Sequence, residues 1–139
     1  MGADEYIATS EDKDWAKHQA RSLDLIVCTV SNDKMPLMDY LQLLRTKGKF
    51  IQVGAPEDKL PDMTAFAFIG KGVSFGGSMI GPPAQIEEML QFVAEKKIKP
   101  WINVYPMKDA NQAIIDFEAG KPRYRISLAN EKNIEKQKK

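Results

Sequence analysis

The chain has 139 residues, and its 20 Lys and Arg residues nearly balance its 19 Asp and Glu residues, for a formal net charge of +1. This balance excludes the broad basic surface of a nucleic-acid-binding protein. Hydrophobic residues make up 43% of the chain, as in folded domains, and no apolar run approaches the roughly 20 residues that cross a bilayer. The chain has no signal-peptide pattern and only one cysteine, so we expect a cytoplasmic protein that is not bound to a membrane.

The first half of the chain predicts alternating strands and helices. In chain order these are a short strand at 3–8, a helix at 9–21, a strand at 23–30, a helix at 35–47 and a strand at 49–54. Thr9 and Asp12 approximate a capping box for the first helix, and Gly48 stands where the second helix would be capped. Residues 23–30 are nearly continuously apolar, which predicts a parallel strand buried on both faces.

The second half continues the alternation. It predicts a short helix at 63–70, a strand at Val73–Ser78, helices at 84–97 and 107–119, strands at 101–104 and 124–128, and a solvated tail at 130–139. Gly120 follows the helix at 107–119 as its C-terminal cap. Strands that alternate with helices predict an α/β fold with a mostly parallel sheet.

Residues that commonly act in catalysis or metal binding are scarce in this sequence. His18 lies in a charged helical segment and is interpreted as a solvated residue, and Cys28 lies mid-strand as a small buried hydrophobe. One histidine and one cysteine do not make a zinc site. No phosphate-binding loop is found, because Gly70 and Gly72 lack a third glycine at the required spacing. We therefore expect no catalytic and no metal-binding residue.

Three predicted strand ends carry small or polar residues. Thr29 ends one strand, Gly54 follows the next, and residues 76–81 read Gly-Gly-Ser-Met-Ile-Gly. In an open parallel sheet, ligands bind beyond the carboxyl ends of the strands. These residues are interpreted either as ordinary turns or as a ligand site.

The order of these segments resembles the C-terminal part of the cinnamyl alcohol dehydrogenase group, with a fungal character. These enzymes are zinc- and NADP-dependent medium-chain alcohol dehydrogenases. The resemblance is carried by residues 2–4 (GAD), 25–30 (LIVCTV), 48–54 (GKFIQVG), 76–81 (GGSMIG), 94–99 (AEKKIK) and 123–126 (RYRI).

The resemblance implies a partial Rossmann-like parallel sheet, built from family strands three to six with flanking helices and a C-terminal strand. Residues 1–129 would form a truncated nucleotide-binding domain with a C-terminal return segment, and residues 130–139 a tail. The catalytic domain with its zinc ligands, and the glycine-rich turn of the first strand, have no counterpart in the chain. The chain would then be a truncated product or a cut piece of a dehydrogenase.

The resemblance also implies cofactor contacts at the nicotinamide end. Thr29 matches a threonine near the nicotinamide ribose, and Gly54 matches the glycine after the fifth strand. Ser78, Met79 and Ile80 match the stretch whose backbone meets the carboxamide. NADP(H) would bind weakly, because the turn that holds the pyrophosphate is missing. Zinc would belong only to the missing catalytic domain.

The expected function is therefore that of a fragment of an NADP(H)-dependent alcohol dehydrogenase, inactive on its own. The resemblance implies a homodimer or larger assembly through the edge strand at Val73–Ser78. Two alternatives stay open. One is a non-catalytic interaction module derived from a dehydrogenase, and the other is a complete small α/β enzyme of another class.

Overall fold

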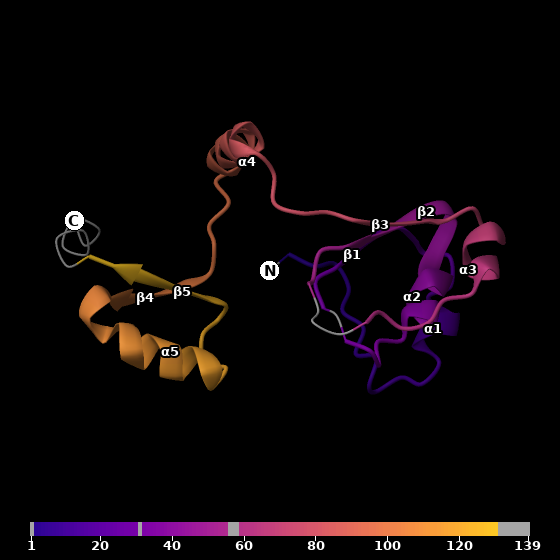
Figure 1. The fold of residues 1–139 in the computed structure, drawn as a ribbon, viewed down its shortest axis with the longest axis horizontal. Helices are drawn as coiled ribbons and strands as arrows, with labels where there is room; N and C mark the ends of the chain where they lie inside the picture. The colour runs from indigo at the N-terminus through magenta and orange to yellow at the C-terminus, as the bar shows by residue number, and fades with distance from the viewer. Residues whose placement is uncertain (1, 31, 56–58, 131–139) are drawn as a thin grey trace. The chain divides into compact units, whose positions relative to one another are not determined.

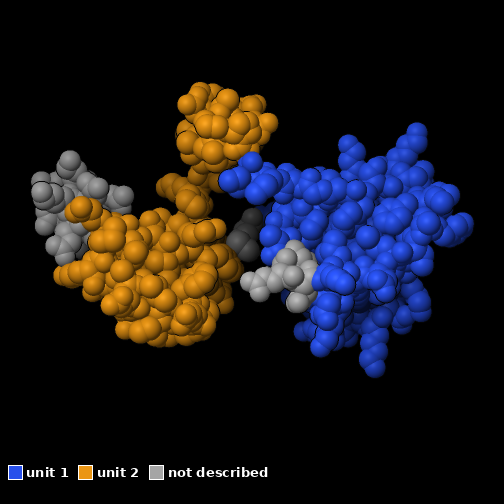
Figure 2. Space-filling view, viewed as in Figure 1, with its two compact units in different colours: residues 1–80 blue, residues 81–139 orange. Residues whose placement is uncertain are grey.

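The computed structural model describes residues 2–30, 32–55 and 59–130, which group into two compact units (Figures 1 and 2). Unit 1 is Met1–Ile80 and unit 2 is Gly81–Lys139, and each is described by itself. The single nucleotide-binding domain expected over residues 1–129 stays a prediction. Residues 131–139 of the expected tail lie outside the described residues. No described helix combines the length and hydrophobicity needed to cross a membrane.

Unit 1 is a three-stranded parallel sheet with short helices. Its elements are α1 (Trp15–His18), β1 (Leu23–Cys28), α2 (Leu37–Leu43), β2 (Leu44–Gln52), α3 (Ala65–Ile69) and β3 (Ser74–Gly77). The strands are ordered β1-β2-β3, so β1 and β3 are the two edges of the sheet. Val27 pairs with Ile51, and Ile51 pairs with Gly76. The predicted α/β class and parallel pairing are confirmed.

The core of unit 1 lies on one face of this sheet. Phe50 in the central strand is fully buried, and its ring stacks on Phe75 at a centroid distance of 5.1 Å. Leu37 and Leu41 of α2 are also almost completely buried in this cluster. The apolar spacing of α2 therefore places one face of the helix against the sheet, which is the main source of stability for so short a helix.

Within unit 1, the other face of β1 is not covered, contrary to the prediction that both faces are buried. Leu25 is 53% exposed and Val27 is 56% exposed, whereas Cys28 is buried. Successive side chains of a strand point to opposite faces, and within unit 1 the helices pack on the face of Cys28. An apolar run predicts a strand with two apolar faces, but it does not specify that both faces have a partner.

The predicted helix at 35–47 ends early, at Leu43. Leu44 is already extended, and the β1–β2 register then shifts by a bulge, because Leu23 pairs with Leu44 but Leu25 pairs with Lys49. Gly48 lies in this bulge rather than at a helix cap. A Cβ atom at Gly48 would lie 3.0 Å from the Arg45 carbonyl oxygen and 3.0 Å from the Leu44 Cβ atom, so a larger residue would have to push these neighbours aside.

The N-terminal segment differs from its prediction as well. Residues 3–8 are not a strand, since no neighbouring strand in the described part of the chain offers them a hydrogen-bond ladder, and Tyr6 is 87% exposed. The helix expected at 9–21 is only Trp15–His18. The Asp12 carboxylate accepts a hydrogen bond from the Asp14 backbone N–H at 2.8 Å, so Asp12 organises this turn without the predicted capping box.

Unit 2 contains a β-α-β unit. Its elements are α4 (Pro83–Glu95), β4 (Ile102–Pro106), the 3-10 helix η1 (Met107–Asp109), α5 (Ala110–Glu118) and β5 (Arg125–Ala129). Within the described part of the chain, β4 and β5 pair only with each other, in parallel, and α5 contacts both strands (Figure 1). Gly120 has a positive φ of 67° after α5, which confirms the predicted glycine cap.

Candidate functional site

The carboxyl ends of β1, β2 and β3 meet at one edge of the sheet in unit 1. Cys28 pairs with Gln52, and Gln52 pairs with Gly77, so the three strands end at the same level. The five residues predicted to bind a cofactor lie within three residues of these ends, and they are Thr29, Gly54, Ser78, Met79 and Ile80. The structure therefore brings all three segments to one edge, as parallel pairing requires.

Gly54 and Thr29 make the closest backbone approach at this edge. The Gly54 N–H donates to the Cys28 carbonyl oxygen at 3.1 Å. A Cβ atom at Gly54 would lie 2.6 Å from the Thr29 carbonyl oxygen and 2.8 Å from its carbon. No side chain fits into that space, so glycine is required here for two loops to touch.

A first hollow of about 690 Å³ lies between the segments that follow β2 and β3. Its lining combines four small residues, one amide and three larger apolar side chains. The lining residues are Gln52, Val53, Gly54, Ala55, Gly77, Ser78, Met79 and Ile80. Met79 and Ile80 are each 89% exposed, so their apolar side chains are open to a ligand. Four of the five predicted residues line this one hollow.

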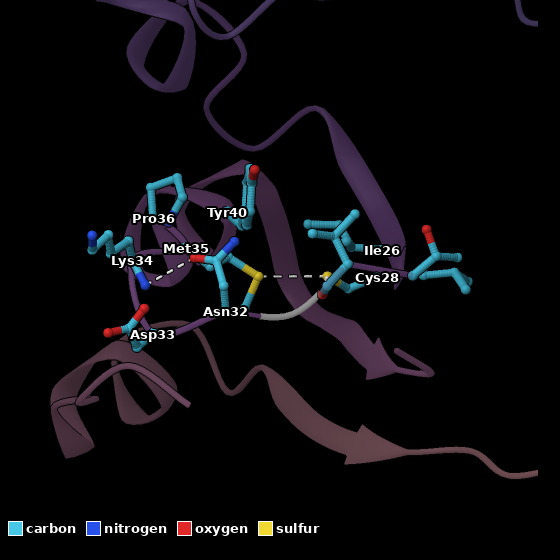
Figure 3. Close-up of a pocket in the computed structure, with 11 residues that line it drawn as sticks. Ile26, Cys28, Asn32, Asp33, Lys34, Met35, Pro36 and Tyr40 are labelled. Carbon is cyan, nitrogen blue, oxygen red and sulfur yellow. Dashed lines mark hydrogen bonds between the residues drawn. The ribbon is translucent and has the colours of Figure 1, made fainter. Parts of the chain in front are cut away.

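Thr29 lines a second hollow, of about 660 Å³, beside the end of β1 (Figure 3). Figure 3 shows the sulfur atoms of Cys28 and Met35 facing one another, 3.6 Å apart. The Asn32 side chain accepts a hydrogen bond from the Lys34 backbone N–H at 2.9 Å, which shapes the loop on one side. Thr29 lines this hollow and Gly54 lines the first, so the close backbone approach described above joins one lining residue of each.

The Tyr40 phenol lines the second hollow. Burial raises the pKa of the Tyr40 phenol, and the nearby Cys28 and Asp39 raise it further, so Tyr40 keeps its hydrogen-bond donor. The Cys28 thiol donates to the Val30 carbonyl oxygen at 2.9 Å. These two groups supply a hydrogen-bond donor and an ordered loop for contact with a ligand.

The described residues do not fit a zinc ion. Cys28 is buried in the core, and His18 lies beside Asp12, with Nδ1 3.0 Å from the carboxylate oxygen, in an exposed turn of unit 1. Across residues 2–30, 32–55 and 59–130, no three His, Cys, Asp or Glu side chains gather in a way that would hold a metal. That zinc belongs to another part of a larger enzyme stays a prediction.

Sequence reasoning missed one residue of the edge, Gln52. It is the last residue of β2, and its side-chain Nε2 donates to the Val30 carbonyl oxygen at 3.1 Å and to the Gly54 carbonyl oxygen at 2.8 Å. The only signal in the sequence is a polar residue between Ile51 and Val53 in an apolar strand. Which groups it would meet depends on the pairing of β1 with β2.

Comparisons with known proteins agree with this geometry. A family model described as zinc-binding dehydrogenase matches residues 1–123. The NADP-dependent alcohol dehydrogenase 6 of Saccharomyces cerevisiae is 33% identical over 132 residues, which cover 92% of this chain and 36% of the yeast protein. A probable cinnamyl alcohol dehydrogenase of Pinus radiata is 36% identical over 126 residues, 91% of this chain and 34% of the pine protein. The chain thus spans about a third of the length of the curated relatives it matches.

A solved structure supports the same fold. A cinnamyl alcohol dehydrogenase from Sorghum bicolor superposes with a TM-score of 0.76 at 31% identity, over 90% of this chain and 35% of the sorghum chain. The relatives come from plants, a yeast and bacteria, so the fungal character suggested by the sequence is not confirmed.

Proposed function

Because the chain belongs to the zinc-binding dehydrogenase family, we propose that it supplies the nicotinamide-side contacts of an NADP(H)-dependent alcohol dehydrogenase. The observation that carries the proposal is the common edge of β1, β2 and β3, where Thr29, Gly54 and Ser78 follow three adjacent strand ends. Ligands of open parallel sheets bind at such an edge.

The lining of the first hollow suits a flat amide-bearing ring. Met79 and Ile80 offer exposed apolar surface, and Ser78 offers a hydroxyl group and backbone polar groups beside them. Gly54 has no side chain, so its backbone atoms are accessible on the same surface. When bound, NADP(H) supplies the hydride for alcohol–aldehyde interconversion. The residues of this chain would bind and orient the nicotinamide end.

The proposal includes weak binding and no turnover by this chain alone. The resemblance gives the family's glycine-rich turn, the one after its first strand, no counterpart in these residues, so we expect the backbone donors that hold a pyrophosphate to be missing. We expect NADP(H) to bind no better than about millimolar, equivalent to roughly −4 kcal/mol. A second function, assembly without catalysis, is favoured by the exposed apolar residues Leu25 and Val27 of β1.

Amide-resolved NMR of the labelled chain tests the proposal. Nicotinamide mononucleotide and NADP+ should shift the backbone signals of Thr29, Gly54 and Ser78 with similar weak affinity, because both carry the group that this edge contacts. Adenosine 2′,5′-bisphosphate should leave these signals unchanged. Low-micromolar binding of NADP+, or shifts confined to unit 2, would contradict the proposal.

We also propose a homodimer or larger assembly through the β3 edge. β3 is a terminal strand of its sheet, and its flanking residue Val73 and its own Phe75 pack into the core, which fixes the strand in place. Its outer backbone groups have no strand partner among the described residues, and a fixed open edge favours pairing with a second copy.

A further inference from the structure

Gln52 is bonded to each of the three segments that form the candidate edge. Its side-chain Nε2 donates to the carbonyl oxygens of Val30, after β1, and Gly54, after β2. Its backbone carbonyl oxygen accepts the N–H of Ser78, after β3, at 3.1 Å. One residue therefore links the three segments on which the proposed function rests.

We propose that Gln52 is a positioning residue for the nicotinamide end of the cofactor. Its amide group holds the segments after β1 and β2 at the spacing that places Thr29 against Gly54. A primary amide has two N–H groups, and both are used on Val30 and Gly54. Gln52 thus acts on the ligand through its neighbours. The inference rests on the proposed function.

A purely stabilising role explains Gln52 less well. Its Oε1 atom is buried and has no hydrogen-bond partner among the described residues. A buried acceptor without a partner destabilises the folded state. A methionine of similar length would remove this unpaired atom together with the two hydrogen bonds. A glutamine at this position is better explained by the spacing of the two loops than by the stability of the fold.

The test compares Gln52→Met and the isosteric Gln52→Glu with Gln42→Met as a matched control. Gln42 lies on the exposed side of α2, where its side-chain amide donates a hydrogen bond to the Asp39 carboxylate at 3.3 Å. Both Gln52 variants should weaken the binding of nicotinamide mononucleotide about tenfold, the effect of one to two lost hydrogen bonds. The thermal unfolding midpoint of Gln52→Met should stay unchanged or rise, and Gln42→Met should bind as the wild type does.

A ligand-free measurement separates this inference from the proposed function. The Gly54 N–H, which is bonded to the Cys28 carbonyl oxygen, should exchange with solvent about tenfold faster in Gln52→Met than in the wild type. Two results overturn the inference. One is an unchanged exchange rate of the Gly54 N–H, and the other is a loss of binding that merely follows a lower unfolding midpoint in both Gln52 variants. If the wild type shows no saturable shift, the proposed function fails, and Gly54 exchange alone decides whether Gln52 holds the loops. Gln52→Glu supplies the same comparison if Gln52→Met does not fold.

Discussion

The ammonium group of Lys71 lies 2.7 Å from the carbonyl oxygen of Leu44, the residue at which α2 gives way to β2. The same Nζ atom donates to the carbonyl oxygens of Leu41 at 2.7 Å and Gln42 at 3.1 Å. The last carbonyls of a helix have no partner within the helix, so a cation from a distant segment caps them. Burial lowers the pKa of this ammonium group, and the nearby charge of Arg21 lowers it further.

Replacing Lys71 with methionine should therefore destabilise unit 1. We expect a loss of about 1.5 kcal/mol in the free energy of unfolding, because charged hydrogen bonds to three carbonyls disappear and the carbonyls lose their partner. Urea unfolding in a Trp101→Phe background, followed by the fluorescence of Trp15, which is buried against α2, measures the change. Lys13→Met, at an exposed position, is the control and should change stability little. Equal stability of the two variants would contradict the capping role.

Asp116 stabilises unit 2 through a buried carboxylate with three partners. Lys121 donates to it at 2.7 Å, Tyr105 at 2.9 Å and Gln112 at 3.0 Å. The hydrogen bond from Lys121, followed by those from Tyr105 and Gln112, holds the pKa of this carboxyl below its ordinary value of 3.8. Because the pKa is lower in the folded state, the stabilisation is present above that ordinary value. It is lost as the pH falls through the folded pKa.

Asp116→Asn should thus lower the unfolding midpoint of unit 2 at neutral pH. It should also reduce the fall of this midpoint as the pH is lowered. Trp101 lies in unit 2, so its fluorescence in a Trp15→Phe background reports this unit alone. Glu118→Gln is the matched control, since Glu118 is exposed on the same helix and should leave the acid dependence intact. An acid dependence that persists in Asp116→Asn would show that another group causes it.

Gly54→Ala should disrupt the edge of the sheet. The added methyl group would overlap the Thr29 carbonyl at 2.6 Å, so the two loops must separate. We expect a loss of about 1–3 kcal/mol in stability and a loss of the ligand-induced shifts at Thr29. Gly76→Ala is the control, because a Cβ atom there meets only Ile51 Cδ1 at 3.8 Å. Chemical denaturation and NMR titration measure the two effects, and a Gly54→Ala chain that folds and binds normally would exclude the close approach.

From the open edge of β3 we expect self-association, and a proline in β3 should weaken it. Ser78 directs its N–H to Gln52 of β2, so the N–H of Gly77 points away, toward the open edge. Light scattering of the wild type should give at least twice the chain mass of 15.7 kDa at high concentration. Gly77→Pro, which removes an outward donor but is tolerated on an edge strand, should shift the mass toward the monomer. A wild-type monomer at every concentration would contradict the proposed dimer.

The sequence predicted the candidate edge better than it predicted the elements near the N-terminus. Thr29, Gly54 and Ser78 follow apolar strands, and parallel pairing was sufficient to bring them together. Residues 3–8 carry a strand-like pattern but stay without a strand, because a short strand forms only where another strand supplies its hydrogen bonds. The role of Thr29, Gly54 and Ser78 in cofactor binding stays a prediction, since binding depends on a ligand and not on backbone pairing alone.

Local patterns in the sequence determined the order of strands and helices, the glycine cap at Gly120 and the burial of Cys28. Each of these features depends on neighbouring residues or on hydrophobicity alone. Tertiary structure decided where α2 ends, since Lys71 reaches its carbonyls from 27 residues beyond Leu44. It also decided which face of β1 is covered, and it made Gln52 the link between two loops. These features depend on hydrogen bonds and packing between segments distant in sequence, which hydrophobic periodicity does not encode.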